Sequence, residues 1–130
     1  MDTFLASRFI NVDVYWKVQA AIDLVVASNG LAKTFYAHQY SGAACRPVTP
    51  TFAGNTVNRT VLVQQLDCHA GVSAYSVSKG LPYVIGETSS VACQGLAGAY
   101  DVFGAAVWTV NCALYAASLN VSDLYWHMGM

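Results

Sequence analysis

The chain has 130 residues, the length of one domain or of part of a larger one. Its net charge is −1 and its sequence contains no Lys/Arg cluster, which excludes nucleic-acid binding through a basic surface. Only 10% of the residues are charged and 55% are hydrophobic, whereas an ordinary soluble domain has roughly 25% charged residues. This composition favours either a membrane protein or a segment of a larger fold whose elements pack against neighbours.

The N-terminal part of the chain contains one expected helix. Residues 1–14 show no clear pattern and no signal peptide, and we treat them as a separate segment of uncertain structure. In residues 15–28 the apolar side chains recur at a spacing that predicts a mostly buried helix. Asn29 and Gly30 are typical of the left-handed turn that ends a helix.

A strand and a long loop are expected next. Residues 31–40 predict a strand in which Tyr36, His38 and Tyr40 share one face. Residues 41–60 are rich in Gly, Pro, Thr and Asn and predict a surface loop. Loops of this length are often functional in compact domains.

The remaining residues predict two further helix–strand units. Residues 61–79 favour a helix, and residues 81–86 a short buried strand that ends before Glu87. Glu87 is the only glutamate of the chain and should lie where a loop begins, since a strand cannot bury an unpaired carboxylate. Residues 100–119 predict a helix and residues 121–127 a final strand. We expect His69, in the first of these helices, to be exposed.

The helix at residues 100–119 has a competing interpretation. Its residues 102–119 carry no charge and reach the minimum length for a membrane span. However, Thr109 and Asn111 interrupt the apolar run, two strands flank it, and no positive segment sets an orientation. We expect a packed helix with Asp101 in its first turn, where a negative charge suits the helix dipole.

Alternating helices and strands predict an α/β fold with parallel strands and right-handed crossovers. The carboxyl ends of parallel strands meet at one edge of a sheet, and in (β/α)8 barrels this edge holds the catalytic groups. Tyr40, Glu87 and His127 each end an expected strand, so we expect them to converge.

The cysteines predict one disulfide and no metal site. Four cysteines allow three pairings, and none has a metal-ligand spacing such as C-x-x-C. Cys45 and Cys93 follow consecutive strands and should lie on the same edge, so we expect them to be bonded. Cys68 and Cys112 fall in helices, and Cys112 lies in an apolar stretch that favours a buried thiol. The sequence predicts no cofactor.

Several motifs together resemble one enzyme family. They are residues 86–90 (GETSS) with 92–95 (ACQG), residues 38–42 (HQYSG), residues 101–108 (DVFGAAVW), residues 114–119 (LYAASL) and residues 123–127 (DLYWH). Their order and spacing resemble glycoside hydrolase family 79, the β-glucuronidase and heparanase-like retaining glycosidases. The resemblance implies that residues 15–130 form the second half of a (β/α)8 barrel, from about helix 5 to strand 8. A whole barrel takes roughly 250 residues.

The resemblance also implies roles for the residues at the strand ends. Glu87 matches the nucleophile, and Tyr40 matches the tyrosine that orients it. We assign His38 to the lining of the site, whereas His127 either contacts sugar hydroxyls or has a structural role. The implied partner is a carbohydrate, a β-glucuronide or related β-glycoside, with neither nucleic acid nor membrane.

The second catalytic carboxylate of the family is not among these residues. A retaining glycosidase needs two carboxyl groups, and the family's acid/base glutamate precedes everything seen in this chain. The resemblance therefore implies a longer parent protein that adds the first barrel half and a C-terminal β-sandwich. The 130-residue segment alone should be inactive. The alternatives are a truncated, non-catalytic pseudoenzyme or a small interaction or membrane protein.

Two triplets bear on localisation. Asn58 and Asn120 each begin an Asn-x-Ser/Thr pattern for N-glycosylation. Together with the resemblance, they favour a secreted parent.

Overall fold

The computed structural model describes residues 19–24, 33–45 and 51–127. Within them the elements are β1 (Phe35–Tyr40), a π-helical turn η1 (Phe52–Thr56), α2 (Arg59–Ser78), β2 (Tyr83–Ser89), α3 (Phe103–Ser118) and β3 (Asp123–Trp126). Residues 19–24 are also helical, in agreement with the helix expected there. The segment 1–14 lies outside the described residues.

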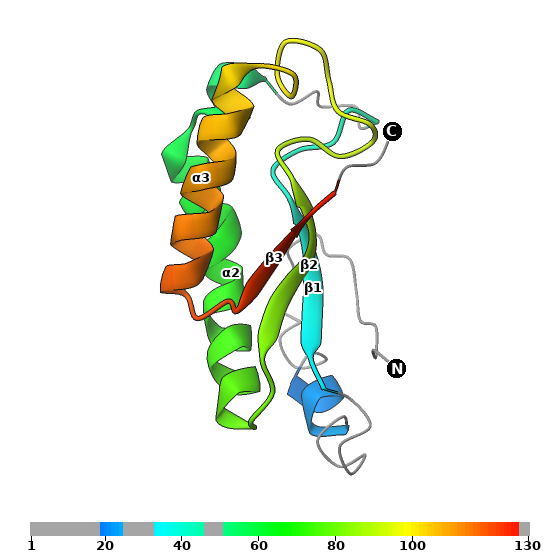
Figure 1. Ribbon diagram of the computed structural model, residues 1–130, viewed down its shortest axis with the longest axis vertical. Helices are drawn as coiled ribbons and strands as arrows, with labels where there is room; N and C mark the ends of the chain where they lie inside the picture. The colour runs from blue at the N-terminus through cyan, green and yellow to red at the C-terminus, as the bar shows by residue number, and fades with distance from the viewer. Residues whose placement is uncertain (1–18, 25–32, 46–50, 128–130) are drawn as a thin grey trace.

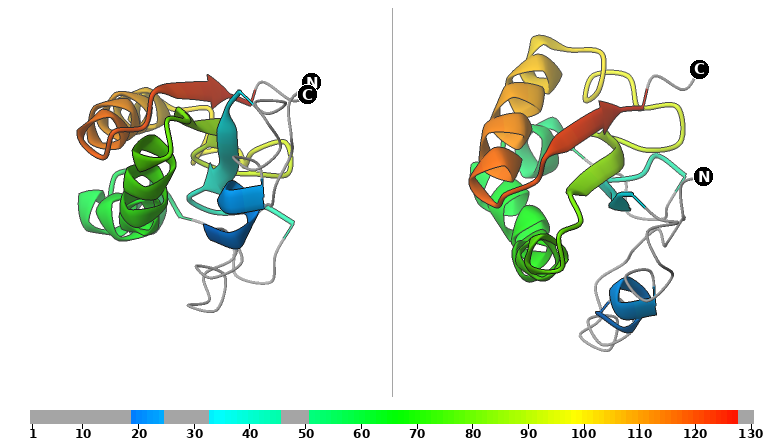
Figure 2. Two further views of the ribbon diagram at one scale, coloured as in Figure 1. Left: turned by 90° about the horizontal axis from the view of Figure 1, so that it is seen from below. Right: turned by 60° about the horizontal axis from the view of Figure 1, so that its bottom comes forward.

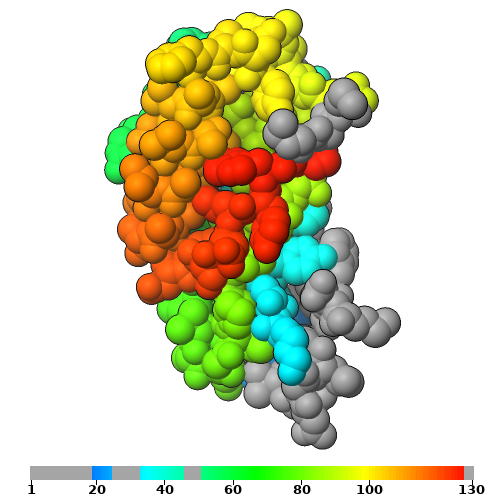
Figure 3. All heavy atoms as spheres, in the orientation of Figure 1, coloured from blue at the N-terminus to red at the C-terminus, as the bar shows by residue number. Residues whose placement is uncertain are grey.

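The three strands form one parallel sheet in the order β1-β2-β3, which confirms the predicted α/β arrangement. Helices α2 and α3 lie side by side against one face of the sheet (Figures 1 and 2). All three strands run towards the edge at the top of Figure 1, where the loops after β1 and β2 lie next to each other. In Figure 3, β3 forms part of the surface beside α3.

The hydrophobic core fills the space between the helices and the sheet. Its larger buried side chains come from β1, α2, β2 and α3, and they include Phe35, Leu62, Leu66, Tyr83, Ile85 and Trp108. Ile22 joins this core from the helical turn at 19–24. Burying such side chains stabilises the fold by about 1.5–3 kcal/mol each. The core therefore fixes the sheet, and with it the strand ends, against the helices.

Local sequence explains where α2 begins and ends. The Asn58 side chain accepts a hydrogen bond from the Val61 amide at 3.3 Å, which caps the helix two residues earlier than predicted. Gly80 follows the helix with φ of +77°, a conformation that glycine adopts without a Cβ penalty.

Several predicted boundaries are wrong. β2 does not stop before Glu87 but continues to Ser89, so Glu87 lies within the strand. Asp101 lies before α3 rather than in its first turn, and its carboxylate accepts a hydrogen bond from the Gly98 amide at 2.6 Å in the preceding loop. β1 begins at Phe35, later than expected.

In the described part of the chain, no helix combines the length and the hydropathy that crossing a bilayer requires.

Candidate active site

The direction of Glu87 depends on an irregularity in β2. Tyr83 and Ile85 point into the core, and strict alternation along the strand would send residue 87 there too. Instead, Ala37 pairs with Ile85 and His38 with Glu87, so that Gly86 is an extra residue with no partner on β1. This bulge shifts the alternation by one position. Glu87 therefore faces away from the helices.

Gly86 permits this bulge because it has no side chain, and the ring of Tyr36 occupies the space where one would lie. A Cβ atom at position 86 would meet Cδ2 of Tyr36 at 2.6 Å, closer than real contacts allow. The Tyr36 ring stacks in turn on the ring of His38, with centroids 5.7 Å apart. The bulge and the aromatic pair thus form one packed unit beside the carboxylate.

Tyr40 donates its phenolic hydrogen to Oε1 of Glu87. Burial, followed by this hydrogen bond, raises the pKa of Tyr40 well above its ordinary value near 10. A raised pKa keeps the phenol protonated, so Tyr40 acts as a donor throughout the physiological range. The phenol therefore supplies a fixed donor to Oε1 of Glu87.

Two imidazoles flank the same carboxylate. Nδ1 of His38 lies 3.5 Å from Oε2, and Nδ1 of His127 lies 3.6 Å from Oε1. These distances exceed an ordinary hydrogen bond but allow electrostatic attraction when an imidazole is protonated. His127 also meets the Tyr40 ring edge-on at 6.3 Å. The structure thus brings together all four residues that the sequence places at the site.

The Glu87 carboxylate is partly accessible, with 32% of its side chain exposed. Among the described residues, the groups that contact it are a phenol and two imidazoles, and none is a second acid. Asp123 begins β3, at the opposite end of that strand from His127. Asp67 accepts a hydrogen bond from Tyr115 on the helical layer. The described residues also contain no group of three His, Cys, Asp or Glu side chains suited to a metal ion.

A disulfide joins the two loops next to the site. Cys45 and Cys93 are bonded, with their Cα atoms 5.8 Å apart. This is the pair expected from the sequence. The backbones on either side pair as well, since Ala92 donates to Gly42 at 2.8 Å and Ala44 donates to Ala92 at 3.1 Å. The bond therefore extends the contact between β1 and β2 beyond the strand ends.

The helical layer holds the end of β1 through polar side chains. Ser41 accepts the indole hydrogen of Trp108 with its hydroxyl at 3.0 Å and a hydrogen of Gln65 with its carbonyl at 2.9 Å. His69, expected to be exposed, is buried, with 5% of its surface accessible. Its turn of α2 faces the sheet, and its ring contacts Tyr83 and Gln39.

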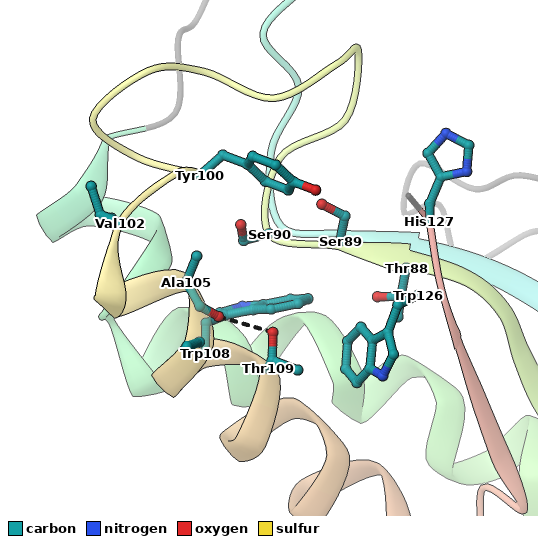
Figure 4. Close-up of a pocket in the computed structure, with 11 residues that line it drawn as sticks. Thr88, Ser89, Ser90, Tyr100, Val102, Ala105, Trp108, Thr109, Trp126 and His127 are labelled. Carbon is teal, nitrogen blue, oxygen red and sulfur yellow. Dashed lines mark hydrogen bonds between the residues drawn. The ribbon is translucent and has the colours of Figure 1, made fainter. Parts of the chain in front are cut away.

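A pocket of about 460 Å³ lies on the helix side of the sheet, between the ends of β2 and β3 and the first turns of α3 (Figure 4). Its walls include the rings of Tyr100, Trp108 and Trp126. His127 also lines this pocket, whereas Glu87 does not. Sequence reasoning missed the pocket, because Trp108 and Trp126 lie on different elements and meet only in the fold, 6.1 Å apart.

The other two cysteines lie on the helices. Cys112 is fully buried, and burial raises the pKa of its thiol to about 12. This agrees with the expected buried thiol. The Cys68 thiol donates to the Gln65 carbonyl at 3.1 Å.

Comparison with known proteins finds two relatives by sequence and one by structure. No protein-family model matches the sequence. A β-glucuronidase of Aspergillus niger is 34% identical over 95 residues, which cover 71% of this chain and 18% of that protein. A β-glucuronidase of Neurospora crassa is 33% identical over 102 residues, which cover 75% of this chain and 18% of that protein.

The chain is a relative of the β-glucuronidases. The resemblance recognised from its motifs is thus confirmed at the level of β-glucuronidase-like glycoside hydrolases. The chain spans only 18% of the length of these two relatives. Their name describes whole proteins of which this chain matches one part.

A solved β-glucuronidase shares the fold. The crystal structure of a 4-O-α-L-rhamnosyl-β-D-glucuronidase from Fusarium oxysporum, in complex with Rha-GlcA, superposes with a TM-score of 0.76. The match covers 86% of this chain and 23% of that one, at 23% sequence identity. At this identity the match supports the arrangement of helices and strands.

Proposed function

We propose that these residues form part of the (β/α)8 barrel of a retaining glycoside hydrolase that acts on β-glucuronides or related β-glycosides. The similarity to two β-glucuronidases and the fold shared with a third support this proposal. A parallel sheet covered by helices on one face is also what a segment of a barrel wall would have, which supports the proposal. Within that barrel, residues 15–130 would run from about helix 5 to strand 8.

Glu87 is the proposed nucleophile. In a retaining mechanism one carboxylate oxygen attacks the anomeric carbon while the bond from that carbon to the leaving oxygen breaks. The leaving oxygen takes a proton from a general acid, and a glycosyl ester of Glu87 remains. Water then attacks the same carbon and gives a proton to the residue that acted as general acid, which now acts as a base. The ester bond breaks and Glu87 is released as a carboxylate. Since Tyr40 engages Oε1, we assign the attack to Oε2.

Tyr40 is the proposed orienting residue. Its hydrogen bond to Oε1 restricts the rotation of the Glu87 carboxylate and aims the other oxygen. His38 and His127 lie on either side of the carboxylate and are the proposed contacts to sugar hydroxyls. No cofactor takes part in this chemistry, and the proposed partner is a carbohydrate.

The remaining parts would come from a longer parent protein. These are the general acid/base, the first half of the barrel and a β-sandwich after it, as in glycoside hydrolase family 79. We further propose that the parent is secreted and glycosylated at Asn58 and Asn120. Asn120 is exposed just after α3. At Asn58, Oδ1 caps α2, which leaves Nδ2 for a glycan.

The observation that carries the proposal is the Glu87 carboxylate, within β2, held by Tyr40 at the end of the paired strand β1, in a relative of β-glucuronidases. The test is the hydrolysis of an aryl β-glucuronide by the parent protein and by its Glu87→Gln variant. We expect Glu87→Gln to lose several orders of magnitude in kcat with an unchanged unfolding transition. Near-normal turnover of this variant would exclude Glu87 as nucleophile.

The second candidate is a non-catalytic, truncated chain. One observation favours it: among the described residues, no acid contacts Glu87. Two carboxyl groups roughly 5–5.5 Å apart are required for retention. The 130-residue chain should therefore show no turnover by itself, and turnover by the parent decides between the two candidates.

A further inference from the structure

Gln39 lies between the two β1 residues that face Glu87, but its side chain points to the opposite side of the sheet. There its Oε1 lies 3.2 Å from Nε2 of His69. Nδ1 of His69 lies 2.7 Å from the hydroxyl of Tyr83. His69 and Tyr83 are both buried, so α2, β1 and β2 meet in a polar contact beneath the site.

The hydrogen bonds in this contact run in one direction. The Gln39 amide nitrogen donates to the backbone carbonyl of Tyr40 at 3.1 Å, which leaves Oε1 as the atom that faces His69. Oε1 can only accept, so Nε2 of His69 carries the hydrogen. Nδ1 then accepts from the Tyr83 hydroxyl. In a neutral imidazole of this tautomer, both ring nitrogens of His69 are hydrogen-bonded within the relay.

We propose that His69 is a positioning residue, which holds the end of β1 through Gln39 so that the Tyr40 phenol meets Glu87. This inference rests on the proposed function, in which Glu87 is the nucleophile. The relay ends on the Tyr40 carbonyl, at the last residue of β1. The next backbone bond to β2, from Ser41 to Ser89, is long at 3.4 Å.

An apolar side chain at position 69 could not replace this function. It would fill the space but take from Oε1 of Gln39 and from the buried Tyr83 hydroxyl the partner that each has now. Gln39 would then be free to turn, and the Tyr40 carbonyl would lose its donor. Buried hydrogen-bonded side chains of this kind favour one arrangement of a core.

The chain offers a direct probe, because Glu87 is its only glutamate. Labelling the 130-residue chain with [13C]glutamate gives one side-chain carboxyl resonance. In the wild type, Tyr40→Phe should move that resonance, since it removes the hydrogen bond. In a His69→Leu background, the shift caused by Tyr40→Phe should fall to less than half, because the bond is already loosened.

His69→Gln and Ser73→Ala are the matched variants. Glutamine can donate to Gln39 from a position near Nε2, so His69→Gln should restore most of the Tyr40→Phe shift. Ser73 is a fully buried residue of the same helix and donates to the Asn120 carbonyl at 2.8 Å, on the α3 side. Ser73→Ala should lower stability and leave the shift intact.

A full Tyr40→Phe shift in the His69→Leu background would overturn the proposal. If His69→Leu does not fold, Gln39→Met breaks the relay at its other end and must reduce the shift in the same way. If Ser73→Ala reduced the Tyr40→Phe shift as much as His69→Leu does, the proposal would also be overturned. A general loosening of the core would then explain the effect. The readout needs no turnover, so its outcome is independent of the assay for the proposed function.

Discussion

Gly86 and Tyr36 are in contact across β2 and β1, where a Cβ on Gly86 would lie 2.6 Å from Cδ2 of the tyrosine ring. The ring cannot simply swing away, because it stacks on His38. This contact explains how the strand accommodates its extra residue. The direction of the carboxylate at Glu87 follows from it.

Gly86→Ala should therefore destabilise the chain by about 1–3 kcal/mol, the usual cost of overpacking a site. Urea unfolding monitored by circular dichroism measures this change. Tyr36→Val opens the space next to position 86, so the double variant should recover part of the loss. If the two effects simply add, Tyr36 is not the obstacle and our explanation of the bulge is wrong.

The Cys45–Cys93 disulfide should contribute substantially to stability, since 48 positions separate the two cysteines along the chain. The chain-entropy model gives about 4 kcal/mol for a loop of that length. The Cys45→Ser/Cys93→Ser variant should lose stability on this scale under non-reducing conditions. Reductant should lower the stability of the wild type and leave the double variant unchanged. A loss below about 1 kcal/mol would contradict the expectation.

Tyr40 should make stability depend on alkaline pH. Because burial and Glu87 raise its pKa in the folded state, folding holds the phenol proton more tightly than the unfolded chain does. This contribution is complete below the unfolded pKa of about 10 and is lost as the pH rises towards the folded value. The difference in unfolding free energy between wild type and Tyr40→Phe should therefore shrink above pH 10. A constant difference from pH 8 to 12 would refute this.

The order of elements and the convergence at the strand ends follow from the sequence, because they depend on local periodicity and on parallel connection rules. The bulge could not be predicted, since it depends on a ring from another strand that occupies the space beside Gly86. The exposure predicted for His69 is wrong for a similar reason. A histidine in a weakly amphipathic helix has no local signal of burial, and its partners Gln39 and Tyr83 are distant in sequence.

Cys112 should be inert towards thiol reagents in the folded chain. Burial raises its pKa to about 12, so at pH 8 the thiolate is about 10³-fold rarer than for an ordinary cysteine. The Cys68→Ser variant leaves Cys112 as the only thiol besides the disulfide pair. In that variant, modification should be slow in buffer and fast above the urea midpoint. Rapid modification of the folded chain would show that the helix–sheet interface opens readily.

The role of Glu87 as nucleophile is tested most directly by covalent labelling of the parent protein. A 2-deoxy-2-fluoro-glucuronosyl donor with a good leaving group slows hydrolysis of the glycosyl-enzyme ester and traps it. Mass spectrometry of the digested protein should then find the sugar on the peptide that contains Glu87, and Glu87→Gln should not be labelled. A label on any other carboxylate, or an equally labelled Glu87→Gln variant, would contradict the assignment.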